Sequence, residues 1–180
     1  VAVEVRSPEQ PCAPWHPGRT AEVRLSGARR GRDVVPGAVV GHAGELHPRV
    51  VRALGLPERA CALEIDLEPL LEAVEAAGVL QVRAVSTFPA GKEDIALVVD
   101  EAVPVAAVEA VIREAAGDLL EEVRLFDVFR GPQLGEGRKS LAFSLRLRAP
   151  DRTLTAGELA GVRKRVVKRA AKRLGAELRA

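Results

Sequence analysis

The sequence predicts an α+β protein, in which a strand-rich N-terminal part is followed by a β-α-β-β-α-β domain with an antiparallel sheet. The second half supports this most clearly, because segments with a two-residue apolar period alternate there with two segments of helical period. The chain has 180 residues, of which 47% are hydrophobic and 29% charged, a composition typical of folded globular proteins. We predict the boundary between the two parts at residues 85 and 86.

The N-terminal part, residues 1–85, consists of short alternating segments separated by turns. Strands are predicted at 1–5, at 21–25, after Pro36-Gly37 within 34–40, and at 60–67. Short helices are predicted at 49–54 and at 68–77, before Gly78. A strand at the very first residue suggests a piece of a longer chain.

Two stretches of this part are predicted to be loops. Residues 11–18 contain three prolines, which are unfavourable in a helix or a central strand. Residues 41–48 contain two glycines and end in a proline. We expect Trp15 to anchor the first loop.

The C-terminal part, residues 86–180, gives the clearer pattern. Pro104 suits the first turn of a helix that ends before Gly117, and Thr155 with Glu158 forms a capping-box pattern. The predicted elements are strand 94–100, helix 104–116, strand 122–130, strand 140–148, helix 155–174 and edge strand 176–179.

This order of elements is the ferredoxin-like plan, in which two helices cover one face of the sheet. The other face would then be open and able to bind a ligand. Alternation places seven residues on it: Ala96, Val98, Ser140, Ala142, Ser144, Arg146 and Arg148. By the same alternation Phe126 and Phe129 should lie on opposite faces, with one of them exposed.

Charge is distributed in blocks, although the whole chain carries only +2. Residues 1–85 sum to −1, residues 86–137 to −7 and residues 138–180 to +10. Much of the basic block falls on the last helix, where we predict a stripe about 13 Å long at 1.5 Å per residue. The stripe consists of Lys164, Arg165, Lys168, Arg169, Lys172 and Arg173. Such a stripe is either a solvated helix face or a surface for a polyanion.

The sequence contains little evidence for a catalytic site or a metal site. The sequence has no glycine-rich phosphate loop, no G-x-S-x-G and no H-E-x-x-H motif, so we predict no catalytic residue. A zinc site could combine Cys12, His16, His42, His47 and Cys61. Because these spacings match no common zinc ribbon or finger, we predict no metal site, and we expect structural hydrogen bonds at His42 and His47.

The composition also indicates where in the cell the protein is located. No stretch approaches 18 uncharged apolar residues, and Glu4 interrupts the start, which therefore does not read as a secretory signal. Two cysteines 49 positions apart do not form a disulfide framework. We therefore expect no membrane association and a cytoplasmic location.

Seven short motifs occur in a fixed order along the chain. The motifs are Trp15–Arg19, Gly41–Pro48, Phe88–Ala90, Asp94–Asp100, Leu125–Gly131, Lys139–Ala142 and Arg152–Thr155. In this order and spacing they resemble the C-terminal end of the bacterial phenylalanyl-tRNA synthetase β chain, and the resemblance covers residues 12–180. One departure lies before Asp94, where the family commonly shows two arginines and this chain has Gly91, Lys92 and Glu93.

The resemblance implies a function for each part. Residues 86–180 would be the ferredoxin-fold anticodon-binding domain, which holds the anticodon end of phenylalanine tRNA. Residues 1–85 would complete a catalytically inactive synthetase-like domain that packs on the α chain. The α chain would aminoacylate tRNA with ATP and Mg²⁺ in an (αβ)₂ heterotetramer, and this chain itself would bind no cofactor. We expect RNA contacts from Lys92, Arg146, Arg148, Lys164, Arg165, Lys168, Arg169 and Lys172.

Two other functions stay open. The chain could be a subunit-assembly module without direct RNA contact, if residues 1–85 bury apolar surface against a partner chain. A small-molecule regulatory domain on the same fold lacks any glycine-rich ligand loop in its favour, although the fold alone does not exclude it.

Overall fold

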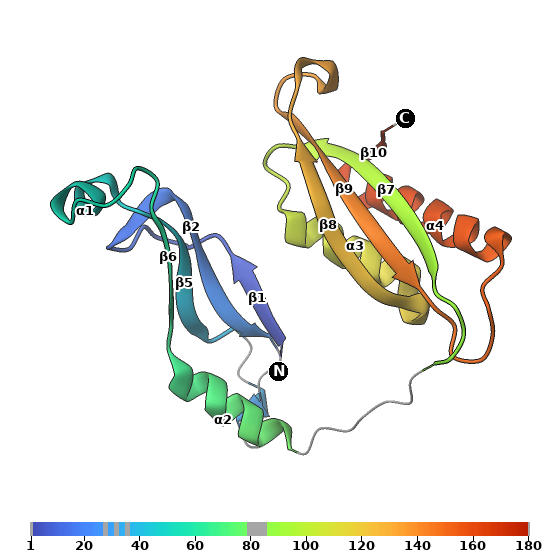
Figure 1. Cartoon of the computed structure of the whole chain (residues 1–180), viewed down its shortest axis with the longest axis horizontal. Coiled ribbons are helices and arrows are strands. Elements are labelled where there is room, and N and C mark those ends of the chain that lie inside the picture. The colour runs from blue at the N-terminus through green and yellow to red at the C-terminus, as the bar shows by residue number, and fades with distance from the viewer. Residues whose placement is uncertain (1, 27–28, 31–32, 35–36, 79–85, 180) are drawn as a thin grey trace. The chain divides into compact units, whose positions relative to one another are not determined.

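The computed structural model describes residues 2–26, 29–30, 33–34, 37–78 and 86–179. The chain divides into two compact units, Val1–Val82 and Arg83–Ala180, which Figure 1 shows. The domain boundary that the sequence predicts at residues 85 and 86 borders the stretch 79–85, which lies outside the described residues.

The first unit is built on an antiparallel sheet with the strand order β1-β2-β5-β6. Helix α2 packs on this sheet through Ala73, which joins Val23, Leu25 and Val40 in a small buried core. A separate ladder pairs β3 with β4. The elements are β1 (Ala2–Arg6), β2 (Trp15–Ser26), β3 (Arg29–Arg30), β4 (Asp33–Val34), β5 (Val39–Leu46), α1 (Pro48–Ala53), β6 (Cys61–Ile65) and α2 (Leu67–Ala77).

The two predicted loops of this unit are partly wrong, because strands run through them. Strand β5 includes most of 41–48, and its glycines allow close packing: a Cβ at Gly41 would lie 2.0 Å from the carbonyl oxygen of Glu64. Strand β2 begins at Trp15 and is irregular between Trp15 and Thr20, which accommodates the proline between them. Trp15 is buried, as expected of an anchor.

The second unit confirms the predicted β-α-β-β-α-β order. Its antiparallel sheet has the order β10-β7-β9-β8. The elements are β7 (Gly91–Asp100), α3 (Val105–Ala116), η1 (Gly117–Leu119), β8 (Leu120–Phe129), η2 (Pro132–Leu134), β9 (Arg138–Leu147), α4 (Ala156–Leu174) and β10 (Glu177–Leu178).

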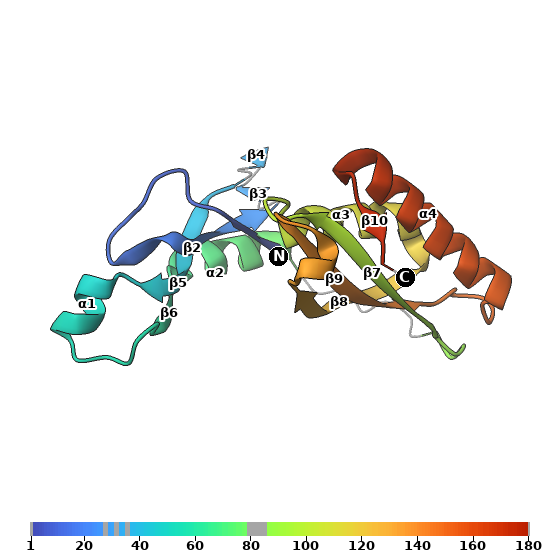
Figure 2. The ribbon, with the colours of Figure 1, turned by 90° about the horizontal axis from the view of Figure 1, so that it is seen from above.

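Helices α3 and α4 cover one face of this sheet, as Figures 1 and 2 show from two directions. Alternate residues of β7 and β9 point to the helices and are almost completely buried. They pack against the apolar stripes of both helices, and Phe143 lies fully buried among them. The main members of this core are Ile95, Leu97, Val99, Val108, Ile112, Leu141, Phe143, Leu145, Leu147, Val162 and Val166.

Helix α4 begins and ends as the sequence predicts. The Thr155 hydroxyl accepts from the backbone N–H of Glu158, and the Glu158 carboxylate accepts from that of Thr155, which completes the capping box. Gly175 ends the helix in the left-handed conformation, at φ 60°. The helix is therefore held at both ends, and its basic residues have fixed positions along it.

Candidate nucleic-acid interface

The face of the second sheet opposite the helices is the open face. Its residues are placed in rows by the strand register, in which Arg146 pairs with Glu122 on one side and with Lys92 on the other. Ser144 likewise lies between Arg124 and Asp94. Charged and small polar side chains therefore alternate across this end of the sheet.

A β-bulge in β8 decides where the two phenylalanines of this strand lie. The register shifts between Leu125 and Asp127, so that Leu125 pairs with Phe143 but Asp127 pairs with Ala142. The extra residue, Phe126, lies with Glu122 and Arg124 on the open face, and Phe129 pairs there with Ser140. The expectation that the two rings lie on opposite faces is wrong, because the bulge interrupts the alternation between them.

Phe126 belongs to a hollow of about 440 Å³ at one end of the open face. Its side chain is 55% exposed, which is unusual for a large aromatic residue. The hollow contains three cations, two carboxylates and one hydroxyl besides the ring. The lining residues are Lys92, Asp94, Glu122, Arg124, Phe126, Ser144 and Arg146.

The other end of the open face is closed by the protein itself. The Arg179 guanidinium lies over the Phe129 ring, 4.6 Å from its centroid, and the Arg179 backbone N–H donates to the Ala96 carbonyl. Beside them, Arg138 pairs with Glu177 at 3.0 Å. Val98 and Ser140, predicted on the free face, do lie on that side of the sheet but are buried. The face is therefore more accessible at the end that contains the hollow at Phe126, where the neighbouring Asp127 is exposed as well.

The two predicted arginines of β9 differ in their surroundings. Arg146 is exposed and forms one ion pair, with Glu121 at 2.7 Å. The guanidinium of Arg148 is half-buried and bonds to Glu121 and to the carbonyl oxygens of Ser86 and Phe88. Arg148 thus fixes the segment before β7 to the sheet, which leaves Arg146 as the accessible cation of the pair.

The basic stripe on α4 divides into two rows. The arginine row points to α3: Arg165 Nε donates to the Ala115 carbonyl at 3.2 Å, and both Arg169 and Arg173 pair with Glu114. The lysine row, Lys164, Lys168 and Lys172, is exposed and forms no ion pair with another described residue. Helix α4 packs on the covered face of the sheet (Figure 2), whereas the hollow at Phe126 is on the open face, so the lysine row lies away from the hollow.

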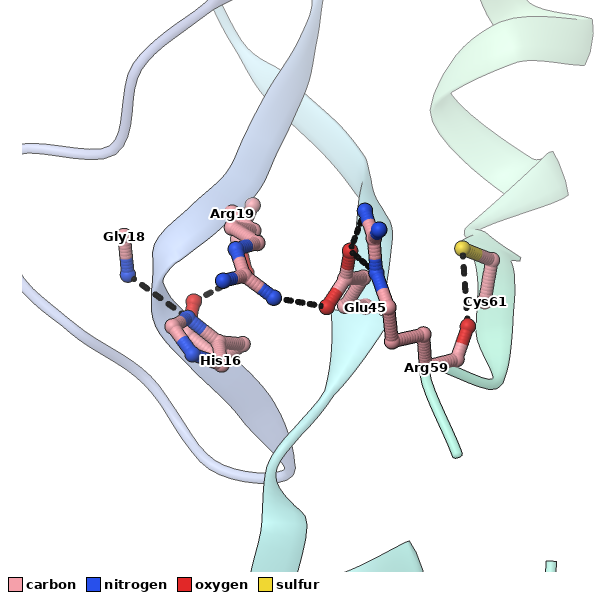
Figure 3. A network of polar contacts seen from close by, with 7 residues as sticks. His16, Gly18, Arg19, Glu45, Arg59 and Cys61 are labelled. Carbon is pink, nitrogen blue, oxygen red and sulfur yellow. Dashed lines mark hydrogen bonds and ion pairs between the residues drawn. The ribbon is translucent and has the colours of Figure 1, made fainter. Parts of the chain in front are cut away.

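The first unit contains a separate polar cluster around the buried Glu45, shown in Figure 3. Arg59 donates to one carboxylate oxygen at 2.8 Å, and Arg19 donates to the other at 2.6 Å. Hydrogen bonds from Arg59 and then from Arg19 hold the pKa of the Glu45 carboxyl below its ordinary value. Both oxygens of the Glu45 carboxylate accept hydrogen bonds from arginines, which connect β5 to β2 through Arg19 and to the segment before β6 through Arg59. The ionised carboxylate has no proton to donate.

The residues considered for zinc occupy separate structural positions. His47 Nδ1 accepts from the Arg49 backbone N–H and caps α1, and the His42 ring stacks on Trp15. His16 accepts from the Gly18 N–H, and the Cys61 thiol donates to the Arg59 carbonyl (Figure 3). Among the described residues, no group of three or more His, Cys, Asp or Glu side chains is placed to hold a metal ion.

Sequence reasoning did not assign three residues of the hollow, Asp94, Glu122 and Arg124, and left open which of Phe126 and Phe129 is exposed. Alternation along β7 places Asp94 on the side of Ala96, and alternation along β8 places Glu122, Arg124 and Phe126 on one side, so these residues could have been found. The bulge, which has no signal in the sequence, follows them and changes the position of Phe129.

Within the described part of the chain, no helix has the length and apolar character needed to cross a membrane.

Comparison with known proteins supplies two family matches. Residues 86–179 match the sequence model described as the ferredoxin-fold anticodon binding domain. Residues 1–67 match the model described as the phenylalanyl tRNA synthetase beta chain CLM domain. The first match covers the whole β-α-β-β-α-β unit described above.

Two curated relatives carry the same name. The chain is 54% identical over 167 residues to the phenylalanine–tRNA ligase beta subunit of Thermobifida fusca, covering 93% of this chain and 19% of that protein. It is 49% identical over 181 residues to the same subunit of Corynebacterium jeikeium, covering 100% of this chain and 19% of that protein. The chain therefore spans about a fifth of the length of the relatives that it matches.

Proposed function

Because this chain belongs to the ferredoxin-fold anticodon-binding family and to the β chains of phenylalanyl-tRNA synthetase, we propose that its second unit binds the anticodon end of phenylalanine tRNA. The open face of the sheet is the contact surface. The observation that carries this proposal is the hollow in which Lys92, Arg146 and an exposed phenylalanine lie together. Cations suit the phosphate groups of RNA, and an exposed aromatic ring suits an unpaired base.

In this proposal the chain holds RNA and performs no chemical step. The α chain of an (αβ)₂ enzyme would aminoacylate the tRNA in the cytoplasm with ATP and Mg²⁺. No cluster of metal ligands among the described residues offers Mg²⁺ a site in this chain. The part played by this chain is to position the tRNA through contacts far from the reacting atoms, an orienting effect that lowers the entropic cost of the reaction.

The predicted RNA contacts are not equivalent under this proposal. Lys92 and Arg146 line the hollow and would contact phosphates there. Arg148, Arg165 and Arg169 would act indirectly, because each bonds within the unit and does not line the hollow. Lys164, Lys168 and Lys172 lie away from the hollow and would attract the polyanion from a distance.

A binding titration of the whole chain tests this function. We expect phenylalanine tRNA to bind more tightly than a tRNA with another anticodon at two salt concentrations. The affinity for both should fall with salt, because bound phosphates release counterions. Equal affinity for the two tRNAs, or no binding at either salt concentration, would contradict the proposal.

The first unit supports a second function, assembly with the α chain. Helix α2 exposes Leu67, Leu71 and Val74 at positions i, i+4 and i+7, with exposed fractions of 61%, 59% and 51%. These positions form one apolar stripe beside the buried side of the helix. An apolar stripe of this kind is typical of a surface that binds another protein.

Sedimentation with purified phenylalanyl-tRNA synthetase α chain tests the assembly function. Leu67→Asp with Leu71→Asp should weaken the complex, because carboxylates would be desolvated in the interface. Leu54→Asp is the control, since Leu54 is equally exposed, at 66%, at the end of α1. An unchanged complex with both α2 substitutions would exclude this stripe from the interface.

A further inference from the structure

An apolar groove of about 550 Å³ lies between α4 and the short edge strand β10. The helix lines it with Ala160, Gly161 and Val167, and the strand lines it with Leu178. Leu178 pairs with the core residue Leu97, so its side chain lies on the face that the helices cover. Nevertheless 40% of Leu178 is exposed. Helix α4 therefore covers Leu178 only in part, and the groove has room for one more apolar side chain.

The edge of the sheet beside this groove is only partly paired. Strand β10 pairs with β7 at Leu97 and Val98, whereas β7 begins at Gly91 and extends well past β10, as Figure 1 shows. Leu159 of α4 lies directly over Gly91, where an added Cβ would be 2.6 Å from the Leu159 Cδ2. The first half of β7 is therefore next to the turns of α4 that line the groove.

Backbone groups of β7 point outward from this part of the edge. The Ala96 carbonyl points to the β10 side, where it accepts from the Arg179 N–H. Because backbone groups of a strand alternate between its two edges, the N–H and C=O groups of Asp94 and Lys92 point to the same side as those of Ala96. No other described residue forms a backbone hydrogen bond with them there. The edge can therefore accept another strand.

The charges around the groove are of one sign. Arg163, Lys164 and Lys168 line it and are exposed, and no carboxylate is among its lining residues. None of these three cations forms an ion pair with another described residue, in contrast to Arg169 and Arg173 on the α3 side of the same helix. The groove therefore favours an acidic ligand.

An extended acidic peptide fits all of these features, whereas RNA fits only the charge. The backbone of a peptide can pair with a sheet edge, and an apolar side chain can enter a groove beside it. Residues on one face of a strand are about 6.6–6.8 Å apart, and Lys164 and Lys168 are about 6 Å apart along the helix axis. Successive side chains of the peptide on the α4 side therefore have nearly the spacing of the two lysines.

We propose that this edge of the second unit is a docking site for an extended acidic segment of a partner protein. The segment pairs with β7 where β10 ends and inserts one apolar side chain between α4 and Leu178. Its carboxylates lie beside Lys164 and Lys168. The groove is on the covered face of the sheet and the hollow at Phe126 is on the open face, so this proposal holds whether or not the open face binds RNA.

Binding of a short acetylated peptide to the full chain, measured by fluorescence anisotropy, tests the groove. In the peptide a central leucine has a glutamate at the next same-face position on each side, and the other residues are threonine. Ala160→Leu fills the groove and should weaken binding about 10- to 150-fold, the usual value of one buried leucine side chain. Ala171→Leu is the matched control, because Ala171 is an exposed alanine of α4 that does not line the groove.

The charge of the groove is tested with two lysines of the same helix. Lys164→Glu should weaken peptide binding about 2- to 5-fold at low salt, as expected for a surface ion pair. Lys172→Glu is the control, since Lys172 is equally an exposed lysine but borders the α3 side of the helix, near Glu114. An equal effect of the two substitutions would show that the peptide is attracted by net charge alone, which contradicts the docking site.

Strand pairing has its own readout. Proline in place of the two threonines beside the leucine removes N–H groups that pair with β7, and should abolish binding. Hydrogen exchange of the Lys92 and Asp94 amides should slow when the original peptide binds. If the proline peptide binds equally well and these amides exchange at an unchanged rate, the edge is not used and the proposal is wrong.

Binding of phenylalanine tRNA distinguishes a peptide site from an RNA site. Ala160→Leu should bind this tRNA as the native chain does, and circular dichroism checks that the variant is folded. If the peptide does not bind to the native chain, the docking site is excluded. If Ala160→Leu also weakens tRNA binding, the groove belongs to the RNA-binding surface instead.

Discussion

The Arg179 guanidinium lies 4.6 Å from the centroid of the Phe129 ring and closes one end of the open face. Together with the backbone bond from Arg179 to the Ala96 carbonyl, this contact fixes the last strand to the sheet edge. It explains why Ser140 is buried on a face without helices. The face is consequently more accessible at the end that contains Phe126.

We expect Arg179→Ala to destabilise the second unit by about 0.5–2 kcal/mol, the range for a cation over an aromatic ring. The short strand β10 pairs with β7 through only two residues, Glu177 and Leu178, so the side chain of Arg179 adds a substantial part of its anchoring. Chemical denaturation measures the free energy of unfolding. Arg163→Ala, an exposed arginine of α4, is the control, and an equal loss in both variants would contradict the role of the contact.

Neutralising equal charge on the two sides of the second unit should affect RNA binding differently. Lys92→Gln with Arg146→Gln removes two cations from the hollow, and should mainly increase the dissociation rate. Lys168→Gln with Lys172→Gln removes two cations from α4, and should mainly slow association at low salt. Stopped-flow binding of phenylalanine tRNA gives both rate constants.

The salt dependence of affinity is the second readout of this comparison. In the variant with Lys92→Gln and Arg146→Gln, the slope of log K against log salt should decrease by about 1 for each phosphate that is no longer bound. If the variant with Lys168→Gln and Lys172→Gln binds RNA more weakly than the variant with Lys92→Gln and Arg146→Gln, and also shows the larger change of slope, the main RNA-binding surface lies on α4 instead.

Removing the cap of α4 should cost measurable stability. Thr155→Ala deletes the hydroxyl that accepts from the Glu158 N–H, and we expect a loss of about 1 kcal/mol, within the usual range of about 0.5–2. Thr153→Ala, an exposed threonine before the cap, is the matched control. Thermal unfolding that is the same in both variants would show that the capping box contributes nothing.

The same cap predicts a pH dependence at Glu158. Hydrogen bonds from the Thr155 backbone and from Arg152 lower the pKa of this carboxyl from 4.5 to about 2. A lowered pKa in the folded state stabilises the fold above pH 4.5, and this stabilisation is lost as the pH falls toward 2. The melting temperature of the native chain should therefore decrease more steeply over this interval than that of Glu158→Gln, and parallel curves would contradict the assignment.

Glycine at position 41 should be essential for the first sheet. In Gly41→Ala the added Cβ would lie 2.0 Å from the Glu64 carbonyl oxygen, so the pairing of β5 with β6 must shift. We expect a cost of about 1–3 kcal/mol, as for other overpacked positions. Gly18→Ala is the control, because a Cβ there meets nothing within 4 Å. Hydrogen exchange of the β6 amides locates the effect.

The sequence by itself determined the order of helices and strands in the second unit, since period, caps and glycine stops are local properties. It did not determine β5, because Gly41 and Gly44 are in a strand only when neighbouring backbones approach closely, and that approach is a property of the assembled sheet. The same local reasoning identified the basic residues of α4 without showing which of them point to Glu114.

Only the tertiary structure decided which part of the open face is accessible and where Phe129 lies. Alternation places side chains correctly until a bulge adds a residue, and the bulge before Asp127 depends on the pairing of β8 with β9. The covering of Phe129 by Arg179 joins residues 50 positions apart in the chain, so no local pattern contains it. Side-chain types were therefore readable from the sequence, whereas their accessibility depended on contacts between distant segments.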